Sequence, residues 1–290
     1  MANPKRSPRA LALALAAGAL LTATSQPAAA SNRDGAMPVP LARSTPVLRT
    51  AAPLALPPAV TIQPISKVAS IKSYKTTVTM RLDGQSGDRA ARGDFSAEMQ
   101  TDAAARRRSI GIAGDLVPVL LGRYLQGVPV SRLTLYLVNS RPYIVAQALI
   151  FKVCAVPGRP VAGLDQLSDG LSAEVLLSRL TGGYKIYGTL VGDEIVNGIP
   201  TRRYRLDAET INALAKRSGA TAELKSGDAW IATQGGYIVR LVVDGAGDLA
   251  ARAGVDFTGD ARITVNVSNL NNVPAIQLPG QCNTPMRLPG

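Results

Sequence analysis

Apolar and polar side chains alternate with a period of two residues over much of this sequence, and this alternation limits the folds that the chain can adopt. Apolar residues favour every second position within 74–82, 95–99, 110–112, 133–137 and 261–268. Such alternation is typical of strands that bury one face of a sheet and expose the other. Because short turn sequences separate these runs, they predict a large antiparallel meander and not a fold of alternating parallel strands and helices.

Two glycine-containing turns predict hairpins within this meander. Asn197-Gly198 suits a type I′ turn, whose two central residues both need a positive φ, and such a turn would place Val196 opposite Ile199 and Asp193 opposite Arg202. Gly235-Gly236 predicts a second hairpin, in which Trp230 would lie opposite Leu241. The dry face predicted for this hairpin consists of Trp230, Ala232, Val239 and Leu241.

Two segments have the spacing of amphipathic helices. Residues 172–180 end before a Gly-Gly pair, and residues 207–218 begin at a predicted N-cap, Asp207, and end before Gly219. A third, helix-like stretch at 65–74 precedes the first strand. The predicted fold is mainly β with α (α+β), with about 9–11 strands and two or three helices.

The first 30 residues are typical of a secretory signal peptide. Basic residues within 1–9 precede an apolar run of about fourteen residues, and small residues lead up to Ser31. The apolar run is shorter than the roughly 20 residues that span a bilayer, so we favour export over a membrane anchor. No cysteine lies near the predicted cut after Ala30, so a lipobox anchor is not expected. We therefore predict a periplasmic or extracellular protein.

A proline-rich segment separates this signal from the patterned part of the chain. Seven prolines within 31–64 interrupt every helical or alternating period. We predict a disordered linker at 31–64 and a single domain at 65–290.

The two cysteines, Cys154 and Cys282, are far apart in the sequence and form no C-x-x-C motif. In an oxidising compartment such a pair more often forms one disulfide, which would fasten the C-terminal tail to the middle of the domain. Two unpaired buried thiols are the alternative.

The absence of histidine excludes several kinds of active site. A chain with no histidine can form no Ser-His-Asp triad, no Cys-His site and no histidine-ligated metal site. The carboxylates are scattered beside glycines and turn positions, where turn chemistry explains them, although the sequence does not exclude a pair that converges in space. We expect no catalytic residues, no metal, no cofactor and no enzyme activity.

Basic residues outnumber acidic ones by 32 to 20 and cluster in two places. The clusters contain Arg106, Arg107 and Arg108 in one place and Arg202, Arg203 and Arg205 in the other. They could bind anionic headgroups or phosphates, or they could form a solvated strand face. Export and an aromatic content of 4% argue against nucleic-acid binding.

The order of motifs resembles that of the bacterial LolA-like and LppX/LprG-like envelope lipid-carrier superfamily. The matching features lie at Ile71 to Val78, in N-G-x-P-x-x-x-Y (197–204), in the helix at 207–218, in G-D-A-W-I-A (227–232), in G-G-Y-I-V-R (235–240) and in the tail at 271–279. The resemblance covers most of 65–282. It implies a strongly curved antiparallel half-barrel whose concavity holds helices and an apolar cavity for acyl chains. The chain departs from the pattern in lacking a lipobox cysteine.

This resemblance and the aliphatic strand faces suggest where an apolar ligand would lie. The cavity candidates are Val78, Met80, Leu82, Phe95, Leu133, Leu135, Leu137, Trp230, Val239 and Leu241, and the headgroup candidates are Arg106, Arg107, Arg108, Arg202 and Arg203. The same faces would look identical in a filled core. The expected function is a non-enzymatic carrier of a lipid or other apolar ligand, with a membrane surface or an envelope protein as further partners. The alternative is an envelope sensor that uses the half-barrel to bind a membrane protein.

Overall fold

The computed structural model of this chain describes residues 59–117, 130–148, 151–157, 172–181, 183–217, 221–248 and 257–287. The predicted signal peptide and residues 31–58 of the predicted linker lie outside these ranges. The linker prediction is wrong at its C-terminal end, because β1 (Ala59–Thr61) pairs with a strand of the sheet and Ile62 is buried. Val60, Thr61 and Ile62 are β-branched and follow the last closely spaced prolines, so this short stretch suits a strand.

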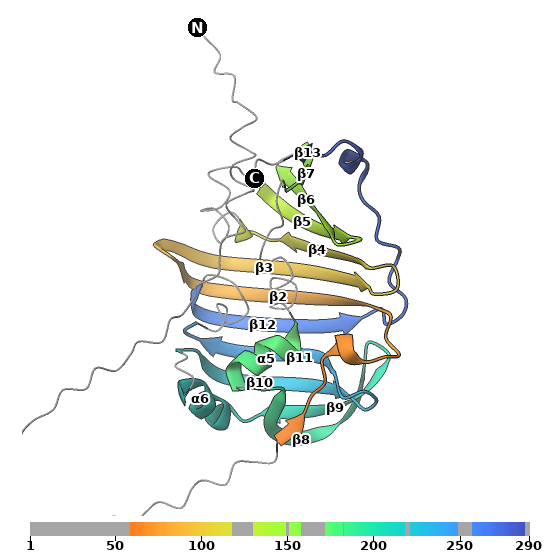
Figure 1. Ribbon diagram of the computed structural model, residues 1–290. Coiled ribbons are helices and arrows are strands. Elements are labelled where there is room, and N and C mark those ends of the chain that lie inside the picture. Colours follow the sequence, from red (N-terminus) through yellow and green to blue (C-terminus); the bar gives the residue numbers. More distant parts are fainter. Residues whose placement is uncertain are drawn as a thin grey trace, which may run out of the picture.

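One 13-stranded sheet forms the molecule, and its strands follow the order β1-β8-β9-β10-β11-β12-β2-β3-β4-β5-β6-β7-β13 (Figure 1). Besides β1 they are β2 (Ser73–Ser86), β3 (Arg89–Asp102), β4 (Arg107–Ala113), β5 (Val130–Val138), β6 (Arg141–Ala148), β7 (Phe151–Val156), β8 (Lys185–Val196), β9 (Ile199–Leu206), β10 (Glu223–Ala232), β11 (Ile238–Ala246), β12 (Thr258–Ser268) and β13 (Met286–Arg287). The predicted mainly β, α+β fold is confirmed, with more strands than expected because short edge strands escape a search for alternation.

Two antiparallel meanders make up this sheet. Strands β2 to β7 form one and β8 to β12 the other, each with neighbours in sequence paired in space. The pairing of β12 with β2 over eleven residues, from Thr258↔Gln85 to Ser268↔Lys75, joins the two meanders. The sheet is open and curved, and it presents an inner face to the helices (Figure 1).

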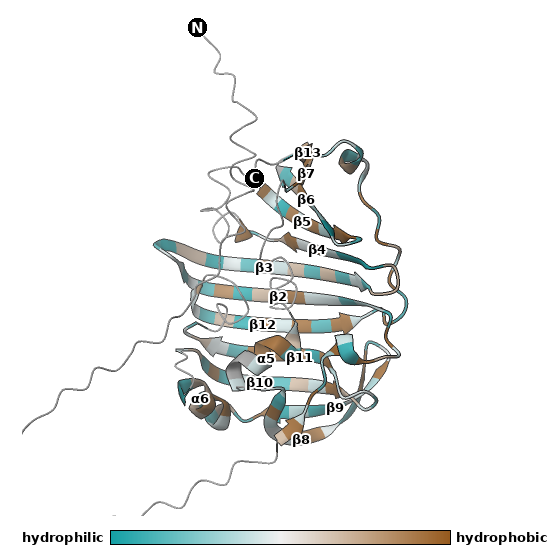
Figure 2. Cartoon of the chain, in the orientation of Figure 1, coloured by the Kyte–Doolittle hydropathy of each residue, from teal (hydrophilic) through white to brown (hydrophobic). Residues whose placement is uncertain are grey.

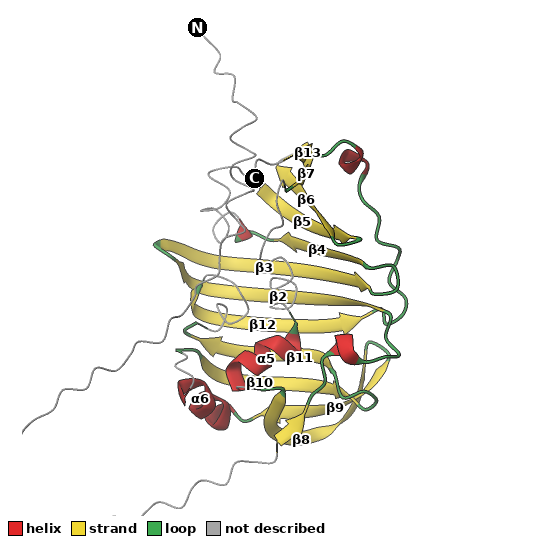
Figure 3. Ribbon diagram, in the orientation of Figure 1, coloured by secondary structure: helices red, strands yellow, loops and turns green. Residues whose placement is uncertain are grey.

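Two α-helices are described, α5 (Ala173–Thr181) and α6 (Ala208–Arg217), together with the short 3₁₀ helices η1 (Ile65–Lys67) and η2 (Gly280–Asn283) (Figure 3). Both predicted α-helices are confirmed. The carboxylate of Asp207 accepts a hydrogen bond from the Thr210 N–H at 3.2 Å, so Asp207 caps α6 as expected. The helix-like stretch at 65–74 forms only η1. None of the described helices is long and apolar enough to cross a bilayer.

The alternation seen in the sequence follows the two faces of the strands, as the bands of hydropathy along β2, β12 and β3 show (Figure 2). In β2 the even-numbered side chains from Tyr74 to Leu82 are buried, whereas Thr79 and Arg81 are exposed. The Asn197-Gly198 hairpin has the predicted register, with φ of 53° and 77° at its two central residues.

The C-terminal tail returns from β12 along the ends of the strands to the far edge of the sheet (Figure 1). There β13 pairs in parallel with β7, and a disulfide joins Cys154 of β7 to Cys282 of η2. This confirms the predicted disulfide. The tail is also held on the way, because the Arg107 guanidinium donates a hydrogen bond to the Ile276 carbonyl at 2.8 Å.

Candidate functional site

The inner face of the sheet carries continuous rows of apolar side chains. Strand register defines these rows, since directly opposed residues of antiparallel strands point to the same side. One row crosses six strands and contains Leu241, Val265, Val78, Ala97, Ile112 and Leu133. The neighbouring rows contain Met80 with Phe95 on one side and Leu135 with Ile110 on the other. Six strands span about 24 Å at the usual spacing between strands.

The described helices pack at one end of this face. Helix α5 packs chiefly against α6, β8 and β11, and α6 packs against β10. The apolar rows continue beyond these contacts through β12, β2, β3, β4 and β5. This continuation is the part of the inner face that we consider as a site.

Most of the predicted cavity residues lie together on this face. Val78, Met80, Leu82, Phe95, Leu135, Val239 and Leu241 are buried members of one apolar cluster. Leu133 is half-buried and packs against the same cluster, and Leu137 is half-buried near the end of β5. Nine of the ten candidates therefore lie on the inner face of the sheet.

Trp230 is the exception, and its assignment to the apolar face is wrong. The predicted hairpin register placed it opposite Leu241. The hairpin instead closes between Ala232 and Tyr237, and a bulge between Trp230 and Ile231 leaves the following residues one position away from the predicted register. Trp230 pairs with Arg240, and Leu241 pairs with Ala229. A shift of one residue moves a side chain to the opposite face of a sheet. Trp230 is therefore on the outer face.

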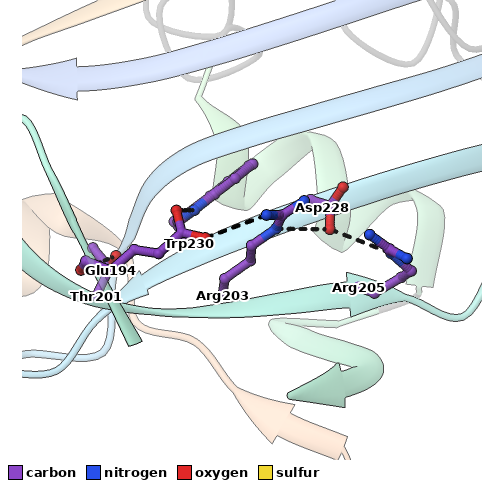
Figure 4. Close-up of polar contacts among 6 residues, drawn as sticks. All are labelled: Glu194, Thr201, Arg203, Arg205, Asp228 and Trp230. Carbon is purple, nitrogen blue, oxygen red and sulfur yellow. Dashed lines mark hydrogen bonds and ion pairs between the residues drawn. The ribbon is translucent and has the colours of Figure 1, made fainter. Parts of the chain in front are cut away.

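A compact polar network surrounds Trp230 on this outer face (Figure 4). The indole N–H donates to a carboxylate oxygen of Glu194 at 2.7 Å. The Arg203 guanidinium lies 5.0 Å from the Trp230 ring centroid and also forms ion pairs with Glu194 at 3.2 Å and Asp228 at 3.1 Å. Arg240 lies 5.6 Å from the same ring. The pKa of Glu194 is lowered, chiefly by the hydrogen bond from Trp230 and then by Arg203.

The arginines predicted to bind a headgroup do not form one cluster. Five strands separate β4, which carries Arg107 and Arg108, from β9, which carries Arg202 and Arg203. Arg106 lies in the turn before β4 with a φ of 53°. Of the five, two lie on the inner side of the sheet by strand register: Arg108 pairs with Leu137, and Arg202 pairs with Ile231. The Arg202 guanidinium lies 3.8 Å from Asp193.

Sequence reasoning missed one buried carboxyl group, that of Glu174 in the first turn of α5. Its side chain is 3% exposed, and its Oε1 accepts a hydrogen bond from the Ile65 N–H at 3.3 Å. Burial raises the pKa of Glu174 to about 7, and hydrogen bonds from the backbone and from Ser172 oppose that rise. The Ser-x-Glu sequence at 172–174 is a usual start of a helix, so it gave no sign that the carboxyl group would be buried.

Two hollows at opposite ends of the strands differ in chemistry. The hollow beside the β2–β3 turn has a volume of about 580 Å³, and its charged lining consists of Arg81, Arg92, Lys225, Arg262, Asp83, Asp94, Asp244 and Asp260. The hollow between the Asn197-Gly198 and Gly235-Gly236 turns has a volume of about 390 Å³. No charged residue lines this second hollow, and its apolar lining residues are Val68, Ile71, Ile199, Pro200, Tyr237 and Leu270. Only the second is suited to an apolar group.

No protein-family model and no curated protein matches this sequence. Among solved structures, the chain is similar to the lipoprotein LppX of Mycobacterium tuberculosis, with 17% identity over 71% of this chain and 90% of that one and a TM-score of 0.36. It is similar to LprF of Mycobacterium bovis, with 15% identity over 72% and 90% of the two chains and a TM-score of 0.35. A putative outer membrane lipoprotein-sorting domain of Vibrio parahaemolyticus matches with 8% identity over 71% and 87%, at a TM-score of 0.22.

Proposed function

We propose that this chain is an exported, non-enzymatic carrier that holds a lipid or another apolar ligand against the inner face of its sheet. The observation that carries this proposal is the extent of the apolar rows, which run through β12, β2, β3, β4 and β5 beyond the principal contacts of α5 and α6. An aliphatic wall suits an acyl chain, because such a chain offers no hydrogen bonds and gains free energy by leaving water. The uncharged hollow at the hairpin turns is compatible with the same class of ligand.

Arg108 is the residue that we propose for contact with an anionic headgroup. It lies in an inner-face row with Thr101 and Leu137, at the end of the strands. A guanidinium at the border of an apolar face can bind a carboxylate or phosphate while the chain lies on the aliphatic wall. Arg203 is less suited to this role, because it pairs with Trp230 on the outer face of the sheet.

The test begins with the full chain, purified in its folded state. Extraction with organic solvent followed by mass spectrometry should recover a lipid, and a fluorescent fatty acid should bind after the extracted lipid is removed. Leu133→Arg should lower uptake at least tenfold, because an acyl chain bound on the aliphatic wall would cover the guanidinium and remove its hydration. Leu133 is half-buried, so its guanidinium can reach solvent and the variant should fold.

Thr134→Arg is the matched control, since Thr134 is the next residue of β5 and points to the outer face. This variant should bind the fatty acid as the unchanged protein does, and circular dichroism should show both variants folded. A protein that yields no lipid and takes up no fatty acid would contradict the proposal. Equal losses of uptake in the two variants would also contradict it.

A further inference from the structure

Exposed apolar side chains are concentrated on one edge strand, β8. Five large hydrophobic residues are exposed within the described part of the chain, and three of them belong to this strand. They are Leu190 (52% exposed), Val191 (51%) and Ile195 (76%). Single exposed apolar residues are common on protein surfaces, but a group on one edge marks a surface that a partner can cover.

The edge of β8 is open over most of its length. On one side β8 pairs with β9, and on the other side β1 pairs only with Lys185, Ile186 and Tyr187. Among the residues that the structure describes, no strand pairs with 188–196 on that side. Nine residues span about 30 Å of strand. The opposite edge of the sheet differs, because β13 covers part of β7 and a disulfide fastens the tail there.

The backbone N–H and C=O groups along this stretch of β8 point alternately toward β9 and outward, and two hydrogen bonds show which residues point outward. The Asp207 N–H donates to the Tyr187 carbonyl, so odd-numbered residues at this end of β8 bond to β9. The Ile62 N–H donates to the Tyr184 carbonyl, so even-numbered residues face the β1 side. Gly188 and Leu190 thus offer both an N–H and a C=O to a new strand.

Charge at this edge distinguishes between two partners, a second copy of this chain and a segment of another protein. Two carboxylates accompany the apolar side chains. That of Asp193 is 77% exposed and lies 3.8 Å from the Arg202 guanidinium, so it can bind a second cation, whereas Arg203 and the Trp230 N–H already bind that of Glu194. Antiparallel pairing of two β8 edges about Gly192 would set these carboxylates opposite Val191 and Leu190 of the second copy. A segment with apolar residues and a nearby Lys or Arg would match both features of the edge.

We propose that the open edge of β8, residues 188–196, binds an extended segment of another protein by strand addition. The segment carries apolar side chains at alternate positions and a basic residue near Asp193. Main-chain hydrogen bonds from Gly188 and Leu190 supply the pairing, and Leu190, Val191 and Ile195 supply apolar contact. This proposal stands apart from lipid binding, because the surface lies at the edge of the sheet and not on the wall formed by β12 to β5.

The experiment uses the full chain and three synthetic peptides. The first is an eight-residue peptide of alternating Val and Thr with a Lys at each end, the second has Glu in place of both Lys residues, and the third is the Lys peptide with alternate backbone nitrogens methylated. Fluorescence polarisation measures binding, and hydrogen exchange measures protection of 188–196. The Lys peptide should bind and slow exchange at 188–196, the Glu peptide should bind at least tenfold more weakly, and the methylated peptide should not bind.

Two variants locate the binding surface. Leu190→Pro removes an outward N–H without removing a bond to β9, and Leu190→Lys keeps the backbone donor but removes the apolar contact. Each should weaken binding of the Lys peptide about fivefold or more. Phe151→Lys is the control, because Phe151 is 69% exposed and lies on β7, near the opposite edge of the sheet. This variant should bind the Lys peptide as the unchanged protein does.

Several results would overturn the proposal. These are no binding of the Lys peptide, equal binding of the Lys and Glu peptides, and binding that survives both Leu190 variants. Slow exchange of the outward Gly188 and Leu190 N–H groups in the chain alone would show that the chain covers its own edge. A dimer that depends on Leu190 in analytical ultracentrifugation would assign the edge to a second copy instead.

Discussion

Glu174 is the one charged side chain that the described part of the fold buries. It lies in the first turn of α5 and accepts a hydrogen bond from the backbone of η1, so it links the N-terminal segment to the helix. Burial disfavours the ionised carboxylate more than these hydrogen bonds favour it, and the pKa rises to about 7. The folded protein therefore binds a proton at Glu174 that the unfolded chain has already released between about pH 4.5 and 7.

We predict that this carboxyl group makes the protein less stable as pH rises. Because the folded pKa is raised, the contribution of Glu174 is fully present below its unfolded pKa and is lost as pH rises through about 7. Urea unfolding from pH 5 to pH 8 should show the unchanged protein losing up to about 3 kcal/mol relative to Glu174→Gln, which has no proton to release. Glu209→Gln, at an exposed position in the first turn of α6, is the control and should follow the unchanged protein. A Glu174→Gln profile parallel to that of the unchanged protein would contradict this prediction.

The two hairpins differ in how well the turn sequence predicts the register of the strands that it joins. The Asn197-Gly198 turn has the two positive φ values that a type I′ turn requires, and the register of β8 with β9 next to the turn is the predicted one. The Gly235-Gly236 turn also has positive φ values, 84° and 60°, but a bulge between Trp230 and Ile231 changes the register beyond it. Trp230 therefore lies within the polar network of the outer face and not beside Leu241, as the sequence predicted.

Gly198→Ala should destabilise the protein by about 1 kcal/mol, because Gly198 has a φ of 77° that an L-residue with a Cβ adopts at a cost. A Cβ at Gly198 would meet no atom within 4 Å, so the cost is conformational. Gly192→Ala is the matched control, since Gly192 has equal space and no positive φ, and its midpoint of urea unfolding should hardly change. Equal effects of the two substitutions would show that the backbone conformation of the turn is not responsible.

At the scale of the molecule, contacts between distant parts of the sequence hold the sheet together. The pairing of β12 with β2 joins the two meanders, and the disulfide brings residues 128 positions apart into contact. The disulfide fastens the tail where β13 covers the edge formed by β7. Within the residues that the structure describes, one edge of the sheet is thus covered by a fastened tail, and β8 at the other end pairs with β1 only at Lys185, Ile186 and Tyr187.

Removal of this disulfide should lower the free energy of unfolding by about 2–5 kcal/mol, because the cross-link restricts a long loop of the unfolded chain. Cys154→Ala combined with Cys282→Ala should show this loss in urea unfolding, together with faster hydrogen exchange in β13 and β7. Dithiothreitol should lower the stability of the unchanged protein to a similar extent. Two free thiols in the non-reduced protein, or equal stability of the double variant, would contradict this prediction.

The sequence by itself determined the fold class, the two α-helices, the Asn197-Gly198 hairpin and the side of the sheet on which nine of the ten cavity candidates lie. These features depend on local rules: a period of two residues, helix caps and turns that require a positive φ. Such rules act within about ten residues, so one sequence is enough to apply them.

Only the tertiary structure decided the pairing of β12 with β2, the bulge that moves Trp230 to the outer face, the burial of Glu174 and the open edge of β8. Pairings between distant strands depend on the packing of the whole sheet, and a shift of one residue reverses the face of every side chain beyond it. Burial of a carboxyl group depends on which segment covers it, here η1 over α5. The open edge of β8 likewise depends on the order of the strands in the sheet. Alternation within β8 does not reveal whether another strand pairs with it.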